Sequence, residues 1–214
     1  MADHPHSDHP GADHPGAEQA RLEQLRAAIV SGDPARSMPA LAALREVPAE
    51  RAVPLLLLGL EQEAFLVRSL SCAGLGVKTS EEGWQALVRA VEGDDDANVR
   101  AEAANALVSH GLERAWPLLL AAFRRDDAWL LRCSVLSAVA EHPEADGPRL
   151  LELASLAIGA DDGTVRVGGA EILGRLVREW GEGDEAQSAR ALLQRLQSDP
   201  DHRVVAAALN GLQG

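Results

Sequence analysis

A single pattern of apolar and small residues recurs along most of the chain. An aliphatic residue is followed by arginine and then by small or apolar residues four, five and eight positions later, as in Val99, Arg100, Ala103, Ala104 and Leu107. The aliphatic position recurs at residues 35, 67, 99, 131, 165 and 204, so the first three steps are 32 residues each and the last two are 34 and 39. Three equal steps indicate an internal repeat.

Each repeat is predicted to be a pair of helices. Positions 0, +4, +5 and +8 of the pattern fall on one stripe of an α-helix, which is the second helix of the pair. An acidic residue precedes each stripe and is expected to cap the helix start; these acids are Asp33, Glu63, Asp96, Asp127, Asp162 and Asp201. The first helix is apolar and carries an early proline, such as Pro54 or Pro117. The longest step predicts an enlarged loop at residues 180–185.

Two short helices cannot bury an apolar stripe by themselves, so neighbouring hairpins must stack. The expected fold is all-α, a right-handed α-solenoid of five to six helical hairpins whose second helices line a continuous concave face. Residues 17–214 are expected to form this array. Residues 1–16 contain three Asp-His-Pro units and no apolar period. They are predicted to be a disordered tail, because they cannot bury enough surface to offset their chain entropy.

Composition agrees with a helical protein and narrows its partners. Hydrophobic residues make up 46 % of the chain, with no Tyr and only two Phe, and Ala and Leu favour helices. The formal net charge of −13 argues against nucleic acid and against anionic membranes, because both attract basic surfaces. The polar N-terminus does not resemble a signal peptide, and the longest apolar run, residues 52–60, is too short to cross a bilayer. A cytoplasmic protein is therefore expected.

The period near 32 and the frame Asp96-x-x-Val99-Arg100-x-x-Ala103-Ala104-x-Ala106-Leu107 resemble HEAT-like repeats of the phycobilisome-lyase type. The resemblance covers roughly residues 18–214, and such repeats are common in cyanobacteria. It implies the solenoid fold strongly and a function weakly, because proteins with these repeats have many roles. Members include bilin lyase subunits, bilin-detaching factors, an iron–sulfur assembly factor and adaptors. The related di-iron hydroxylases carry His-Glu ligand pairs, and this sequence has no His-Glu dipeptide.

The repeated acid and arginine have two interpretations. They are expected to form a structural ladder, in which the acid bonds the helix start and the arginine ties adjacent units; the ladder residues are Asp96, Arg68, Arg100, Arg132 and Arg166. The alternative is a charged groove that recognises a ligand.

No catalytic, cofactor or metal residue is predicted. The tail histidines His4, His6, His9 and His14 are a flexible set without fixed ligand geometry. Together with Cys133 they leave an accessory factor in metal or iron–sulfur cluster delivery as a second alternative. Cys72 lies on the apolar stripe and is expected in the core. A nucleophilic cysteine needs a base and an orienting group, and the sequence identifies neither.

The exposed side of the second helices is the candidate partner surface. Its residues are small and mildly polar, which suits a partner helix or loop better than a compact metabolite. Phe65 and Trp129 share a position near two helix starts, where an exposed aromatic is a reasonable anchor, although both are equally compatible with packing over a neighbouring loop. The candidate residues are Trp129, Phe65, Glu102, Asn105, Cys133, Ser137 and Glu171. The sequence thus predicts a protein-binding scaffold, with a subunit of a bilin lyase or a bilin-detaching factor acting on phycobiliproteins as the alternative.

Overall fold

The computed structural model describes residues 15–213, which form twelve α-helices, one short 3-10 helix and no strand. The predicted tail of residues 1–16 lies outside this range, apart from Pro15 and Gly16, which begin α1. The helices are α1 (Pro15–Ile29), α2 (Pro34–Ala43), η1 (Leu44–Glu46), α3 (Ala49–Leu60), α4 (Phe65–Val77), α5 (Glu81–Gly93), α6 (Ala97–Val108), α7 (Leu112–Arg125), α8 (Trp129–Glu141), α9 (Gly147–Ala157), α10 (Gly163–Trp180), α11 (Asp184–Leu196) and α12 (His202–Gln213).

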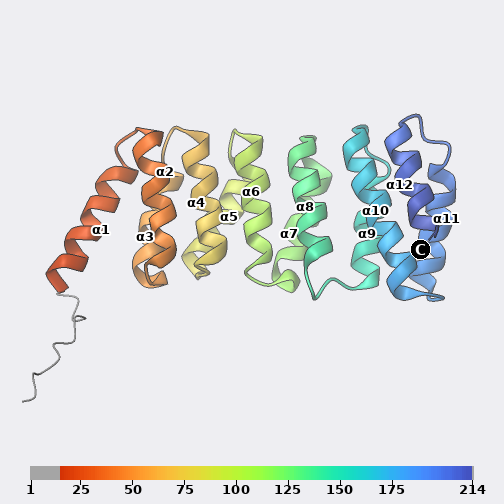
Figure 1. Ribbon diagram of the computed structural model, residues 1–214, viewed down its shortest axis with the longest axis horizontal. Helices are drawn as coiled ribbons and strands as arrows, with labels where there is room; N and C mark the ends of the chain where they lie inside the picture. Colours follow the sequence, from red (N-terminus) through yellow and green to blue (C-terminus); the bar gives the residue numbers. More distant parts are fainter. Residues whose placement is uncertain (1–14, 214) are drawn as a thin grey trace, which may run out of the picture.

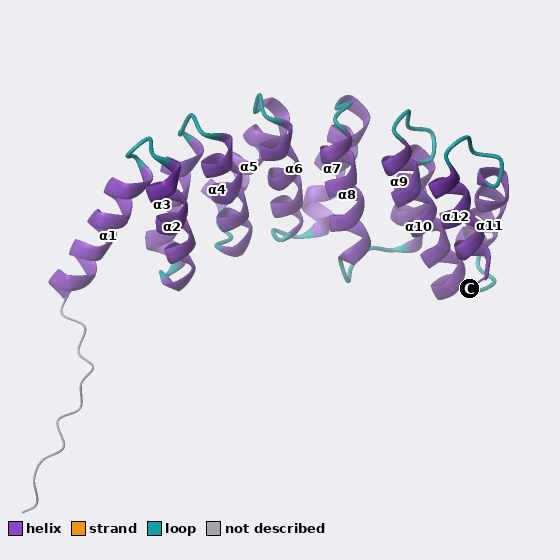
Figure 2. Cartoon of the chain, turned by 45° about the horizontal axis from the view of Figure 1, so that its top comes forward, coloured by secondary structure: helices purple, strands orange, loops and turns teal. Residues whose placement is uncertain are grey.

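The helices are arranged as six hairpins stacked along one axis (Figure 1). Consecutive helices pair within each hairpin, and the second helices α2, α4, α6, α8, α10 and α12 pack side by side in chain order. Loops connect the helices along the upper and lower edges of the stack, and α1, at one end of the stack, is inclined to the other helices (Figure 2). This arrangement is the α-solenoid that the repeat predicts. None of the described helices combines the length and apolar character needed to cross a lipid bilayer.

Burial follows the repeated stripe in the central hairpins. In α6 the residues at 0, +4, +5 and +8, which are Val99, Ala103, Ala104 and Leu107, are all inaccessible to solvent. The stripe weakens in α12, where Leu209 at +5 is 44 % exposed because no hairpin covers it within residues 15–213. The core is therefore continuous from one hairpin to the next, as stacking requires.

The first copy of the repeat lies in a different register from the one predicted. The stripe of α2 does not begin at Ala35, which is exposed, but at Ser37, and continues through Ala40, Leu41 and Leu44. Ser37 is polar and does not fit an apolar pattern, yet its hydroxyl is satisfied: Oγ lies 3.0 Å from the carbonyl oxygens of both Ile29 and Asp33, either of which can accept its one proton.

Two other local predictions are wrong. Residues 180–185 do not form an enlarged loop: the additional residues lengthen α10 to 18 residues, because Leu176 and Val177 extend its buried stripe, and only residues 181–183 connect it to α11. Glu63 and Asp127 do not cap α4 and α8, whose N-cap residues are alanines without a capping side-chain bond. Asp33, Asp96 and Asp162 do cap their helices, each accepting a hydrogen bond from the backbone N–H two residues later.

Candidate functional site

Three of the repeated arginines connect one hairpin to the next through a paired carboxylate. Arg68 donates from Nε and Nη2 to the two carboxylate oxygens of Asp94, at 2.8 and 2.9 Å. The same two-bond contact joins Arg100 to Asp126, at 2.5 and 3.3 Å, and Arg166 to Asp199, at 2.9 and 3.0 Å. The aspartate side chains are only 13, 11 and 8 % exposed. Such bidentate, shielded pairs are stronger and more directional than exposed ion pairs.

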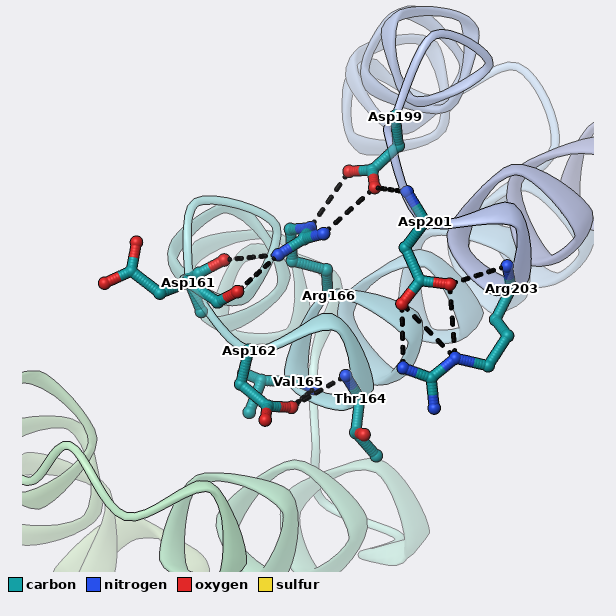
Figure 3. A network of polar contacts seen from close by, with 9 residues as sticks. Asp161, Asp162, Thr164, Val165, Arg166, Asp199, Asp201 and Arg203 are labelled. Atoms are coloured by element: carbon teal, nitrogen blue, oxygen red, sulfur yellow. Dashed lines mark hydrogen bonds and ion pairs between the residues drawn. The ribbon is translucent and has the colours of Figure 1, made fainter.

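Each of these arginines also holds the loop that precedes its own helix. In the pair drawn in Figure 3, Arg166 donates from Nη1 to the carbonyls of Ala160 and Asp161, at 3.0 and 2.7 Å. Asp199 in turn accepts from the backbone N–H of Asp201 at 2.8 Å. One guanidinium therefore fixes two successive inter-helix loops, which explains why the arginine recurs with the repeat period.

Burial and hydrogen bonding act in opposite directions on these carboxylates. Burial raises the pKa of Asp94, but the bonds from Arg68 and from the Asp96 backbone outweigh it and lower the pKa below its ordinary value. The bond from Arg166 is the main reason that the pKa of Asp199 is also lowered. Both groups are therefore held in the charged form that the ion pairs require.

The expected link from Arg132 to the next hairpin is absent. Its Nε donates to the carbonyl of Phe123 at 3.2 Å, its guanidinium carbon lies 5.6 Å from the Phe123 ring centroid, and its Nη2 meets Asp127, which is 98 % exposed. All these partners belong to its own hairpin. The reason is that Ala160 occupies the position that Asp94 and Asp126 occupy in earlier repeats, six residues before the next arginine.

Sequence reasoning identified the arginines but missed their carboxylate partners. Asp94 and Asp126 stand six residues before Arg100 and Arg132, and Asp199 stands six residues before Val205, at the equivalent place in the last copy. The six-residue spacing can be read from the repeat. It distinguishes the aspartates that pair with an arginine from neighbouring acidic residues that do not. Val30, Gln62 and Ala160 stand at the same position in the three copies that lack the acid.

An open, shallow groove crosses the exposed side of α4, α6 and α8. We call it the α6–α8 groove; it is lined by Ser69, Asn98, Ala101, Glu102, Asn105, Leu130, Cys133, Ser134 and Ser137. Ser134 spans its floor by donating to the carbonyl of Ala101 at 2.7 Å. The groove brings together four of the predicted partner-binding residues: Glu102, Asn105, Cys133 and Ser137.

A second depression, the α8–α10 groove, adjoins it. Ser137 lines both grooves, and the α8–α10 groove also contains Glu171 together with Glu141, Arg175 and Arg178. It lies where α8 and α10 pack least extensively among neighbouring second helices, and like the α2–α4 junction it has no arginine–aspartate pair within residues 15–213. The acidic and basic side chains in this groove give it mixed charge.

The two candidate aromatic anchors lie at helix starts and outside both grooves. Trp129 is the first residue of α8 and is 48 % exposed; Phe65 is the first residue of α4 and is 38 % exposed. Trp129 directly precedes Leu130, which lines the α6–α8 groove. The Trp129 indole has about half of its surface in water and is available to a partner, whereas Trp84 is buried against Arg114, whose guanidinium lies 4.0 Å from the ring centroid.

The two cysteines differ in burial. Cys72 is inaccessible to solvent, and burial raises the pKa of its thiol to about 12. Cys133 is half-buried in the α6–α8 groove, where burial also raises its pKa. Within residues 15–213, no three His, Cys, Asp or Glu side chains converge to hold a metal ion. The tail histidines lie outside the described residues.

These observations define the class as an α-helical repeat protein with open grooves on its second-helix face. Comparison with known families agrees, because residues 53–140 match the family described as HEAT repeats. The matched stretch runs from within α3, through α4 to α7, to the residue before the last of α8. The match supports a HEAT-like repeat protein, the coarser form of the predicted resemblance. No curated protein sequence matches the chain.

Proposed function

We propose that this chain is a protein-binding scaffold that holds its partner on the second-helix face. The α6–α8 groove supports this proposal most directly, because it gathers Glu102, Asn105 and Ser137 from two helices in one open depression. Trp129, which is exposed, directly precedes the lining residue Leu130. HEAT repeats and a helical solenoid fit such a role. A shallow groove of mixed polarity suits the side chains of a helix or loop better than a small ligand, whose sites are usually enclosed and mostly apolar.

The physical roles of the groove residues follow from their positions. Trp129 provides a large, half-exposed apolar surface, and such aromatic residues often contribute most to the binding free energy. Glu102, Asn105 and Ser137 line the groove, where polar and acidic groups favour a partner with basic and hydrogen-bonding side chains. The Arg68–Asp94 and Arg100–Asp126 pairs hold α4, α6 and α8 in register and so preserve the shape of the groove.

The test is capture from a native lysate of the source cell on the immobilised full-length chain. A partner should be retained by the wild type and lost on combining Trp129→Ala with Glu102→Arg. The matched control combines Leu209→Ala with Glu182→Arg; both residues are exposed, and both lie in the last two hairpins, away from the groove. Equal retention by both double variants, or no retention by the wild type, would contradict the proposal.

Bilin handling is the alternative that the resemblance implies, and the same experiment addresses it. A coloured tetrapyrrole or a phycobiliprotein in the retained fraction would replace the scaffold proposal. Metal or iron–sulfur delivery is the second alternative. A difference in metal binding between the full chain and a form without residues 1–14 would favour it.

A further inference from the structure

The first two second helices differ in length, which leaves part of α4 uncovered. α2 has 10 residues and ends where the chain turns into η1, whereas α4 has 13. The result is a depression with a volume of about 230 Å³, the α2–α4 groove, lined by Leu41, Ala42, Leu44, Arg45, Leu56, Leu70, Ala73, Gly74, Val77 and Lys78. Val77 is 63 % exposed, a large fraction for an aliphatic side chain.

This part of the second-helix face is apolar where the following repeats are polar. Leu70 and Ala73 stand where Glu102 and Asn105 stand in α6, 32 residues later. Eight of the ten residues lining the groove carry no charge and no polar side-chain atom. The face therefore changes from apolar at the α2–α4 groove to polar and acidic at the α6–α8 groove.

The groove also carries positive charge on an otherwise acidic protein. Its two charged lining residues are Arg45 and Lys78, and Lys78 is the single lysine of a chain with formal net charge −13. Lys78 Nζ donates to the backbone carbonyl of Arg45 at 2.8 Å, which holds the ammonium next to that residue. Within residues 15–213, neither side chain forms an ion pair, so both charges are available to an occupant.

We infer that the α2–α4 groove binds an amphipathic helix of a partner protein, with an apolar stripe flanked by acidic side chains. Apolar residues three and four positions apart would enter between α2 and α4, while carboxylates meet Arg45 and Lys78. Charge complementarity selects an acidic partner segment. The inference rests on the proposed scaffold function and adds the chemistry of one partner segment and its place on the face.

The experiment uses the full chain and two synthetic 16-residue peptides labelled with fluorescein. In both peptides, leucines spaced alternately three and four residues apart form one apolar stripe. One peptide has glutamates on either side of the stripe, and the other has lysines. Fluorescence anisotropy at physiological ionic strength, which screens the net charge of −13 over long distances, should show the acidic peptide binding at least tenfold more tightly than the basic one. Val77→Asp should weaken binding at least tenfold, and Lys78→Glu should remove the preference for the acidic peptide. Leu209→Asp, an exposed apolar residue of α12, is the matched control and should leave binding unchanged.

Three outcomes would overturn the inference: no binding of the acidic peptide at millimolar concentration, equal binding of both peptides, or unchanged binding by Val77→Asp. Sedimentation velocity tests a fourth outcome that would overturn the inference. If the wild type forms a dimer and Val77→Asp is a monomer, the occupant of the groove is a second copy of this chain. Trp129→Ala with Glu102→Arg should leave peptide binding intact. If the peptide fails to bind while a lysate partner still depends on Trp129, only this inference fails and the scaffold function stands.

Discussion

Asp94 receives two hydrogen bonds from Arg68, which belongs to the preceding hairpin, and a third from the backbone N–H of Asp96 at 2.9 Å. The carboxylate thereby links two hairpins and also shapes the loop that begins α6. In a solenoid, each hairpin touches only its neighbours, so the stability of the array depends on these junctions. A residue that belongs to both the loop and the junction is a sensitive place to test the ladder.

Asp94→Ala should lower the free energy of unfolding by about 2 kcal/mol, because Arg68 keeps its partly buried position without its carboxylate partner. Urea denaturation followed by circular dichroism measures this change. Asp95→Ala is the control, since Asp95 is exposed and its side chain makes no hydrogen bond or ion pair within residues 15–213; it should change stability by less than about 0.5 kcal/mol. Equal effects of the two substitutions would show that the pair contributes nothing specific.

Ala160→Asp should stabilise the junction between α8 and α10 by about 0.5–1 kcal/mol, by supplying the acid that Arg132 lacks. Arg132 would exchange its bond to the exposed Asp127 for a better shielded carboxylate. Thermal unfolding measures the gain, and the Arg132→Ala background provides the control, because there the same substitution should give no gain. A gain that persists without Arg132 would mean that the new carboxylate acts in another way.

The ladder also predicts loss of stability in acid. The folded pKa of Asp199 is lowered, mainly by the bond from Arg166, and that of Asp201 is lowered to about 2, mainly by the bond from Arg203. A group with a lowered folded pKa contributes its full stability above the unfolded pKa of about 4 and loses it as pH falls through the folded value. Urea midpoints measured between pH 5 and pH 2 should fall less steeply for Asp199→Asn than for the wild type. Parallel curves would show that Asp199 does not contribute to this dependence.

The architecture could be predicted from the sequence because one constraint acts at every repeat. Val99, Leu131 and Val165 must be buried against both their own hairpin and the next. An apolar residue therefore recurs every 32 to 34 residues in the amino-acid sequence. The terminal copies escaped this constraint: α2 begins its stripe with the polar Ser37, whose burial depends on carbonyl partners that no apolar pattern reveals. The extended α10 was missed because the glycines after Trp180 suggested a longer loop than the packing of Leu176 and Val177 allows.

The candidate site was only partly accessible to sequence reasoning. The register of the second helices placed Glu102, Asn105, Cys133 and Ser137 on one side, and the structure places them in one groove. The α2–α4 groove arises from the difference in length between α2 and α4, and helix ends are poorly determined by periodicity. The six-residue spacing of the carboxylates that pair with the arginines could be seen in the sequence. The acid nearest each helix start, such as Asp96, stood close by and could equally have been taken for the arginine's partner.

The contact between α10 and α12 depends on two glycines. A Cβ on Gly174 would lie 2.8 Å from the Cα of Gly211, and backbone cannot move aside as a flexible side chain can. Gly174→Ala should therefore lower the free energy of unfolding by about 1–3 kcal/mol. Gly93→Ala, at the last residue of α5 with no atom within 4 Å of the new methyl group, is the matched control and should be neutral or slightly stabilising. Urea denaturation distinguishes them, and a neutral Gly174→Ala would show that the two helices separate at little cost.

The two cysteines should report on the core and on the proposed binding face separately. Cys72 is fully buried and should react with a thiol reagent such as 5,5′-dithiobis-(2-nitrobenzoate) only after unfolding, whereas the half-buried Cys133 should react in the native chain. Burial, with the charges of Asp162 and Glu171 adding to it, raises the pKa of Cys133, so its rate should be slow at neutral pH and increase as pH rises. Cys133→Ser should abolish the native reaction. Because Cys133 lines the α6–α8 groove, a bound partner should protect it; reaction of two thiols in the native chain, or no protection by a captured partner, would contradict this placement of the binding face.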